Sequence, residues 1–218
     1  MNDENIYSHR NGLVILQHAL PDAYSQLLEI LNFNEETDLR IRTEKHLTNS
    51  TTNKSSSDIY NKIIESRFLA LNWLGQPRIF SDDSYDSWKL DFGKQNMAAV
   101  EVAFNNASYV PHILAKLEIS CVELHRIKKD INAQEGILIV ASEELKKSQN
   151  FDTTCVTFEG VIKFLHAYET MLTSPMVVFA IDAPKTFKIQ GNKKQQDAQK
   201  NSGTPLKDLV DRAKVINL

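Results

Sequence analysis

At 218 residues the chain is long enough to bury a core and has the size of one medium domain. Its 42% hydrophobic and 24% charged residues are typical of a globular protein, and no apolar run approaches the roughly 18 residues that span a bilayer. The polar, acidic start (MNDENIYSHRNG) is unlike a signal peptide, so we expect a soluble, cytoplasmic protein with no membrane partner. A formal net charge of -3 indicates no general preference for nucleic acid, although a local basic surface would matter more than the sum.

The first half of the chain shows two helical patterns separated by a polar segment. Apolar residues recur on one face after Pro21, which predicts a helix over residues 21–31. Residues 47–58 (LTNSTTNKSSSD) are rich in Ser, Thr and Asn and predict a mobile loop. Helical spacing returns over residues 59–74, and Gly75 marks the expected end of that helix.

The second half alternates short apolar strands with amphipathic helices. The expected strands cover residues 90–92, 98–104, 136–141 and 176–182, and the expected helices lie within residues 108–130 and 158–172. This order predicts a mixed α/β sheet with helices on its faces.

The chain changes character after Pro184. Residues 185–200 contain five lysines against one acid and few large apolar side chains, which predicts a loosely ordered arm. We therefore expect a single domain over residues 1–184, and a basic C-terminal arm with a short terminal segment over residues 185–218. The arm's lysines either add nonspecific affinity for DNA or are simply solvated.

Two carboxylates stand out in LDFGKQNMAAVEVAF, residues 90–104. Glu101 lies in an apolar strand pattern, where an unpaired charge is costly, and Asp91 lies ten positions before it. If the two strands are adjacent and antiparallel, both carboxylates project to the same side and can share Mg²⁺, which binds a few carboxylate oxygens and retains waters. The alternative is a core strand with one structural ion pair.

The same stretch resembles the PD-(D/E)xK nuclease signature, in which an Asp on one strand is followed by Glu-x-Lys, Glu-x-Glu or Glu-x-Gln on the next. LDFGKQNMAAVEVAFNNASYV is similar to the active-site hairpin of the BglII and BstYI type II restriction endonucleases. The resemblance extends over roughly residues 6–184 through YSHRNG, HALPDAYSQLLEIL, EGILIVASEELKK, TFEGVIKFL and VVFAIDAP.

The resemblance implies a restriction-endonuclease-like mixed β-sheet flanked by helices. It also implies a homodimer that cuts double-stranded DNA with Mg²⁺ at a short palindrome with a GATC-type centre, leaving 5′ overhangs. Asp91 and Glu101 match the metal-binding acids, and Gln76 matches an accessory polar residue near the metal. Ala103 stands where the family has Gln and relatives have Lys or Glu, so the third catalytic group is missing from its usual position.

Ala103 leaves three interpretations open. It is an inactivating substitution, or another side chain such as Lys94 or Gln95 does its work, or the chain is a natural DNA-binding protein that no longer cuts. A more distant alternative is an unrelated α/β protein in which Asp91 and Glu101 are structural.

Polar residues around the hairpin and in a later loop are the candidates for contact with DNA. Asn side chains can bond the major-groove edge of adenine, and lysines pair with phosphates. The candidates are Lys94, Asn105, Asn106, Ser108, Lys116, Asn150, Thr153 and Thr154. Turn chemistry at residues 105–108, a plain connection at residues 148–154 and solvated lysines remain open as alternatives.

Overall fold

A computed structural model describes residues 3–49, 56–104, 106–123, 127–190 and 214–218. Within these ranges six strands form one sheet in the order β1-β6-β5-β4-β3-β2. They are β1 (Ile6–His9), β2 (Leu74–Gly75), β3 (Phe92–Lys94), β4 (Ala98–Ala103), β5 (Glu135–Ala141) and β6 (Met176–Ile181). The three central strands β4, β5 and β6 are parallel and the outer pairings are antiparallel, so the sheet is mixed as predicted.

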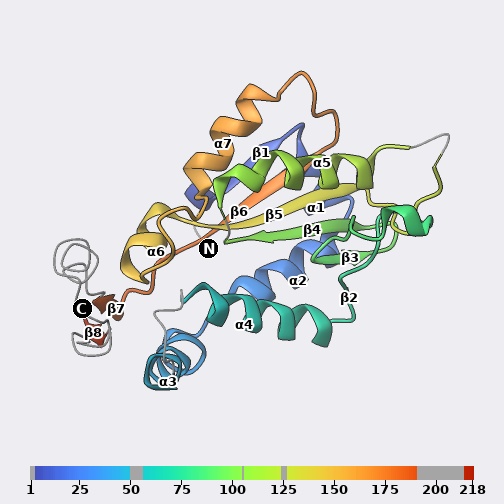
Figure 1. Cartoon of the computed structure of the whole chain (residues 1–218). Helices are drawn as coiled ribbons and strands as arrows, with labels where there is room; N and C mark the ends of the chain where they lie inside the picture. The colour runs from blue at the N-terminus through green and yellow to red at the C-terminus, as the bar shows by residue number, and fades with distance from the viewer. Residues whose placement is uncertain (1–2, 50–55, 105, 124–126, 191–213) are drawn as a thin grey trace, which may run out of the picture.

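Helices cover both faces of this sheet (Figure 1). One face carries α5 (Val110–Cys121) and α7 (Phe158–Ala167), and the other carries α1 (Gly12–His18), α2 (Pro21–Leu31) and α4 (Ser57–Ala70). The remaining helical segments are α3 (Ile41–Asn49), α6 (Glu143–Ser148), a π-helical segment (Glu35–Arg40) and the short turns Asp3–Asn5, Asp83–Tyr85 and Ala107–Tyr109. No helix in the described part of the chain is long and apolar enough to cross a membrane.

Strand β5 separates two hydrophobic cores. Ile137 and Ile139 belong to the cluster that contains the apolar faces of α2 and α4, whereas Leu138 and Val140 belong to the cluster under α5 and α7. This division follows from the period of two along a strand. All seven residues of β5 are buried, and the six after Glu135 form the continuous apolar run that a strand between two helical layers requires.

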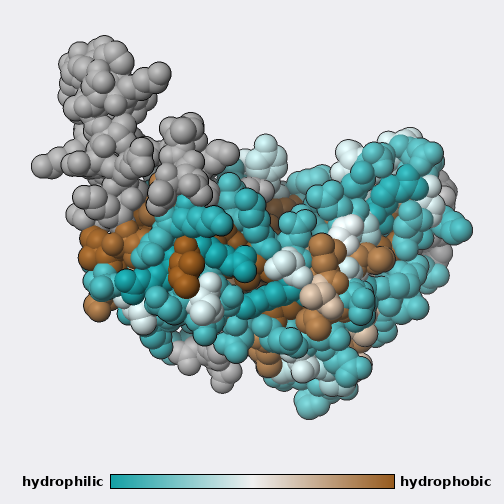
Figure 2. Space-filling view, turned by 90° about the horizontal axis from the view of Figure 1, so that it is seen from below, coloured by the Kyte–Doolittle hydropathy of each residue, from teal (hydrophilic) through white to brown (hydrophobic). Residues whose placement is uncertain are grey.

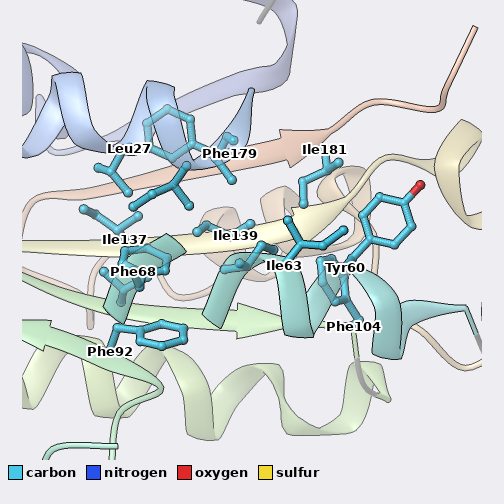
Figure 3. Packing of buried hydrophobic residues seen from close by; sticks show 14 of the residues in the cluster. Leu27, Tyr60, Ile63, Phe68, Phe92, Phe104, Ile137, Ile139, Phe179 and Ile181 are labelled. Carbon is cyan, nitrogen blue, oxygen red and sulfur yellow. The ribbon is translucent and has the colours of Figure 1, made fainter. Parts of the chain in front are cut away.

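Helix α4 supplies large side chains to the core on its side of the sheet (Figure 3). Tyr60, Ile63 and Phe68 are each at most 2% exposed. The ring of Phe68 stacks on Phe92 of β3 at a centroid distance of 4.3 Å and meets Trp73 edge-on at 5.1 Å. These contacts fix α4 against the hairpin of β3 and β4.

The surface on the side of α3 and α4 is mainly hydrophilic, with hydrophobic side chains in separate patches (Figure 2). Ile41 of α3, Leu69 of α4 and Leu74 of β2 are among the exposed large apolar residues. Scattered residues of this kind are normal on a protein surface and indicate no particular contact.

The helix predicted over residues 21–31 coincides with α2, and the strands and helices predicted in the second half are confirmed with shifted ends. The largest shift is in α5, which ends at Cys121 although the predicted helical pattern ran to residue 130, and α7 ends at Ala167 instead of residue 172. The predicted helix over residues 59–74 ends at Ala70, because Asn72 has a left-handed φ of 60° and Leu74 enters β2.

The mobile loop predicted over residues 47–58 is wrong at both ends. Helix α3 continues to Asn49 and α4 begins at Ser57, while residues 50–55 lie outside the described residues. Asp58 lies in the first turn of α4, where a negative charge complements the helix dipole, so this polar residue belongs to the helix. The polar composition alone therefore predicted a loop that was too long at both ends.

The C-terminal arm is less simple than its composition suggested. Strand β7 (Phe187–Gln190) pairs antiparallel with β8 (Lys214–Asn217), and Phe187 is fully buried in the core that contains α2 and α4. The expected loose order is therefore wrong for β7, because the side chains of Phe187 and Ile189 are buried and anchor this strand. Residues 191–213 lie outside the described residues, and the domain boundary at residue 184 stays a prediction.

Glu135, at the start of β5, is a buried acid with no hydrogen-bond partner for either carboxylate oxygen among the described residues. It lies against the start of α1, so closely that a side-chain carbon at Gly12 would collide with Glu135 Oε1 and with the carbonyl oxygen of Met176. Burial raises the pKa of Glu135 to about 8, because the carboxylate loses its hydration without gaining a partner.

We expect Glu135→Gln to remove a pH-dependent loss of stability. The folded state keeps the proton up to about pH 8, whereas the ordinary value for the side chain is 4.5, so the free energy of unfolding falls as pH rises through this window. The variant should exceed the parent by about 1–3 kcal/mol at pH 8.5 and match it closely at pH 5, measured by urea unfolding. Glu144→Gln, at an exposed acid of α6, is the control. An equal effect at both pH values would contradict this account.

Candidate active site

The hairpin of β3 and β4 brings the two predicted metal ligands together. The pairing of Phe92 with Val100 places Asp91 directly opposite Glu101. Asp91 Oδ2 accepts a hydrogen bond from the backbone N–H of Val102 at 2.7 Å, which holds its carboxylate against β4. The expectation of adjacent antiparallel strands with both acids at one place is therefore confirmed.

Glu101 lies on the face of β4 that α5 covers. Glu101 is only 3% exposed, and Lys116 Nζ of α5 forms an ion pair with Glu101 Oε1 at 2.6 Å. Lys116 Nζ also donates a hydrogen bond to the carbonyl oxygen of Lys89 at 2.9 Å. Helix α5 thus delivers a fixed positive charge to the hairpin.

Burial and mutual repulsion destabilise the charged forms of both acids. Burial raises the pKa of Glu101 to about 8, and the neighbouring Asp91 adds to this rise, while Lys116 opposes it. Burial also raises the pKa of Asp91, against the lowering effect of the Val102 N–H and of Lys116. Two buried acids that repel each other form an environment that a divalent cation would stabilise.

A cavity of about 390 Å³ opens onto these two acids. Helix α4 contributes Asn61 and Glu65 to its wall, the segment after β2 contributes Gln76, and α5 contributes His112 and Lys116. The predicted accessory residue Gln76 therefore lies beside the two acids. Its backbone has a left-handed φ of 50°, and its N–H donates to the carbonyl oxygen at position 91 at 2.9 Å.

Sequence reasoning missed three of these polar residues. Asn61 and Glu65 are four positions apart and share one helical face, but neither was named as a candidate for the site. His112 was not named as a candidate either. The one available signal in the sequence was the spacing of Asn61 and Glu65, which places two polar side chains on the same face of a helix that ends near the hairpin.

The donor set of the cavity fits a hard divalent cation. Among the described residues, no group of three His, Cys, Asp or Glu side chains is arranged to hold a metal. Mg²⁺ does not need one, because it commonly binds through one or two carboxylates together with waters and substrate phosphate. Asp91 and Glu101 match this requirement, and the cavity leaves room for a phosphate.

The two lysine candidates for DNA contact occupy different places. Lys94 does not line the cavity, because its Nζ donates to Gln26 Oε1 at 3.2 Å and lies over the ring of Trp73. Lys116 lines the cavity but is paired with Glu101. Asn105 lies outside the described residues.

The two polar loops predicted to read DNA lie side by side. Asn106 and Cys155 form an isolated antiparallel bridge, and the N–H of Ala107 donates to the carbonyl oxygen of Thr154 at 3.0 Å. The first loop runs into Tyr109, an exposed aromatic residue in the cavity wall. Both loops therefore belong to one surface that continues into the cavity.

Some polar side chains of these loops are engaged locally. Asn106 Oδ1 accepts a hydrogen bond from the N–H of Ser108 at 2.9 Å, and the Thr154 hydroxyl donates to Asp152 Oδ1 at 2.6 Å. These bonds are the turn chemistry that was the alternative to DNA contact. The exposed candidates are Asn106, Ser108, Asn150, Thr153 and Thr154.

The sheet order, the helical layers and the paired acids define the fold of a restriction endonuclease. The BglII restriction endonuclease in complex with a DNA 16-mer has the same fold, with a TM-score of 0.59, 13% sequence identity and 98% of each chain covered. Free BglII matches with a TM-score of 0.53, again at 13% identity and 98% of each chain. No curated protein matches the chain in sequence.

The sequence matches the family described as "Restriction endonuclease BglII/BglIII" over residues 5–181. This range is most of the chain, which therefore belongs to that family of site-specific nucleases. The predicted fold class and the predicted class of enzyme are confirmed.

Proposed function

We propose that the chain is a Mg²⁺-dependent type II restriction endonuclease of the PD-(D/E)xK kind. It acts on duplex DNA as a homodimer, cuts a short palindrome with a GATC-type centre and leaves 5′ overhangs. Membership of the restriction endonuclease family supports the nuclease activity. The observation that carries the site is the pairing of Asp91 and Glu101 across the hairpin, at the wall of one cavity.

Asp91 and Glu101 supply the oxygen ligands of the metal. A divalent cation held by these two carboxylates would supply Lewis-acid chemistry, polarising the phosphate and lowering the pKa of a water. The Val102 N–H fixes Asp91 in the orientation that faces Glu101. Gln76 and Asn61 offer neutral amide groups at the cavity wall, suited to orienting a water or a phosphate oxygen.

The joined polar loops are the proposed recognition surface. Asn106 and Asn150 carry amides that can read the major groove, and Thr153 offers a hydroxyl. Because the loops continue into the cavity wall at Tyr109, bases read there lie close to the cut phosphate. A palindromic site requires two such surfaces related by a twofold axis, which is the reason for proposing a homodimer.

A catalytically silent DNA-binding protein on the same fold is the second candidate. It is favoured by Ala103, which is 1% exposed and packs in the apolar cluster with Val110 and Ile113. Strand β4 therefore offers no polar group beyond Glu101 on this face. A binding protein would retain the loops and the acids but lack hydrolysis.

Cleavage of unmethylated plasmid DNA with Mg²⁺ tests the proposal. We expect the parent chain to give discrete fragments whose sequenced ends share one palindrome and carry 5′ overhangs, and we expect EDTA to abolish them. Ala103→Gln and Ala103→Lys are assayed in parallel. If none of the three proteins cuts, while each binds the same DNA in Ca²⁺, the silent binding protein is the better account.

A further inference from the structure

The cavity contains one positive charge that the two-acid site leaves unexplained. Among the described lining residues, Lys116 alone carries a permanent positive charge. Hydrolysis of a phosphodiester builds up negative charge on the phosphate oxygens, and preorganised cations are an effective means of stabilising it. A cation in this place therefore has a chemical use besides neutralising Glu101.

Lys116 is held in place as a catalytic group must be. Its side chain is 12% exposed, its Nζ lies 2.6 Å from Glu101 Oε1, and the same Nζ donates to the Lys89 carbonyl oxygen at 2.9 Å. The Nζ thus has one ion-pair partner and one hydrogen-bond acceptor, and an ammonium group has three protons to donate. Burial strengthens its electrostatic effect, because little water remains to screen it.

Lys116 also approaches the site over the face of β4 on which the strand has no polar side chain beyond Glu101. Ala103 lies two positions after Glu101 and so points to the same face of β4, the face covered by α5. Its methyl group belongs to the same buried apolar cluster as Val110 and Ile113 at the start of that helix. The Lys116 side chain comes from one turn further along α5 and ends at Glu101.

Lys94 and Gln95, the two other side chains considered as replacements for the missing catalytic group, have hydrogen-bond partners away from the cavity. Lys94 bonds Gln26 and lies over the ring of Trp73. Gln95 Oε1 accepts a hydrogen bond from the backbone N–H of Asn132 at 3.0 Å. Neither lines the described wall of the cavity.

We propose that Lys116 is the third catalytic group of this nuclease, delivered by α5 in place of the missing side chain on β4. Its ammonium contacts a non-bridging oxygen of the cut phosphate and stabilises the charge that develops there. In the step itself water forms a bond to phosphorus, the bond from phosphorus to the leaving deoxyribose oxygen breaks, that oxygen takes a proton from solvent, and the attacking water releases one. Lys116 keeps its protons throughout. This inference rests on the proposed function.

Lys116→Met tests the role, because methionine keeps most of the aliphatic stem and removes the ammonium. We expect the single-turnover cleavage rate at saturating DNA to fall about 10²–10³-fold, the loss typical of one transition-state donor. DNA affinity measured in Ca²⁺ should change less than about tenfold, because a single phosphate contact contributes little to it. Lys129→Met is the matched control, since Lys129 also donates to backbone carbonyls of α5, at Ile119 and Ser120. It lies outside the described cavity wall and should cleave like the parent.

A Mg²⁺ titration separates catalysis from simple neutralisation of Glu101. If Lys116 only balances the charge of Glu101, excess Mg²⁺ takes over this task and the variant's rate climbs to that of the parent. If Lys116 acts on the phosphate, the plateau rate at saturating Mg²⁺ stays reduced about 10²-fold or more. Thermal unfolding of each variant in Ca²⁺ and DNA verifies that the folded complex is being compared.

The outcomes distinguish this inference from the proposed function. Cleavage by the parent together with a plateau within threefold in Lys116→Met overturns the role of Lys116 and leaves the nuclease standing. No cleavage by the parent, but cleavage by Ala103→Gln or Ala103→Lys, also overturns it, because the site then needs a group on β4. No cleavage by any of these proteins overturns both proposals.

Discussion

Replacement of Asp91 by Asn is expected to abolish DNA cleavage while the fold and DNA binding persist. The asparagine keeps an oxygen that accepts the Val102 N–H, so the hairpin remains closed. The lost negative charge is a metal ligand in the proposed mechanism, and its removal should lower the single-turnover rate by on the order of 10³-fold or more. The measurement is single-turnover cleavage in Mg²⁺ beside DNA affinity in Ca²⁺.

The control for this experiment is Asp86→Asn, at an exposed acid shortly before the hairpin. It removes the same charge from the chain but leaves the cavity unchanged, so cleavage should be retained. Stability provides a second check. Asp91 raises the pKa of Glu101, so its neutralisation removes a repulsion and should not destabilise the fold. Cleavage at the parent's rate by Asp91→Asn would contradict the metal site.

Phe68→Ala is expected to have the largest effect on stability. Phe68 is fully buried, stacks on Phe92 and meets Trp73, so its removal leaves a cavity between α4 and the hairpin. Such truncations typically cost about 3–5 kcal/mol. Because Phe92 directly follows Asp91, the loosened packing should also lower cleavage. Urea unfolding measures the first effect and the cleavage rate below the unfolding transition measures the second.

Leu69→Ala is the matched control on the same helix. Leu69 neighbours Phe68 in sequence but is 49% exposed, so its truncation removes little buried surface. We expect a change within about 1 kcal/mol. A similar loss for Leu69→Ala and Phe68→Ala would contradict the packing account, because alanine is the better helix former at both positions and helix propensity cannot cause a loss.

The hairpin and its two acids were predictable because a strand's side chains alternate and the turn between the strands is short. The same local rules identified α2, β5 and β6, whose apolar patterns are clear over six or more residues. Strand β1 and strand β7 have four residues each, too few for a pattern to stand out. Their place is decided by what they pair with, β6 and β8 respectively.

The remainder of the candidate site depends on tertiary packing that a sequence pattern does not encode. Lys116 was expected to contact DNA phosphate as a surface lysine, and only the packing of α5 over β4 brings it to Glu101. Asn61 and Glu65 reach the cavity from the opposite layer of helices, across the edge of the sheet. Site residues of this kind can be identified only from the packing of the helices on the two faces of the sheet.

The bond between the two polar loops bears on how such an enzyme acquires a new target. The N–H of Ala107 and the carbonyl oxygen of Thr154 join segments that are nearly fifty positions apart in the chain. If these segments read DNA as proposed, a substitution in one shifts the backbone that positions the other. The specificity for a DNA sequence would then depend on both segments together, each matched to the other. Single exchanges should weaken discrimination, and a clean switch of site should require transplanting both loops together.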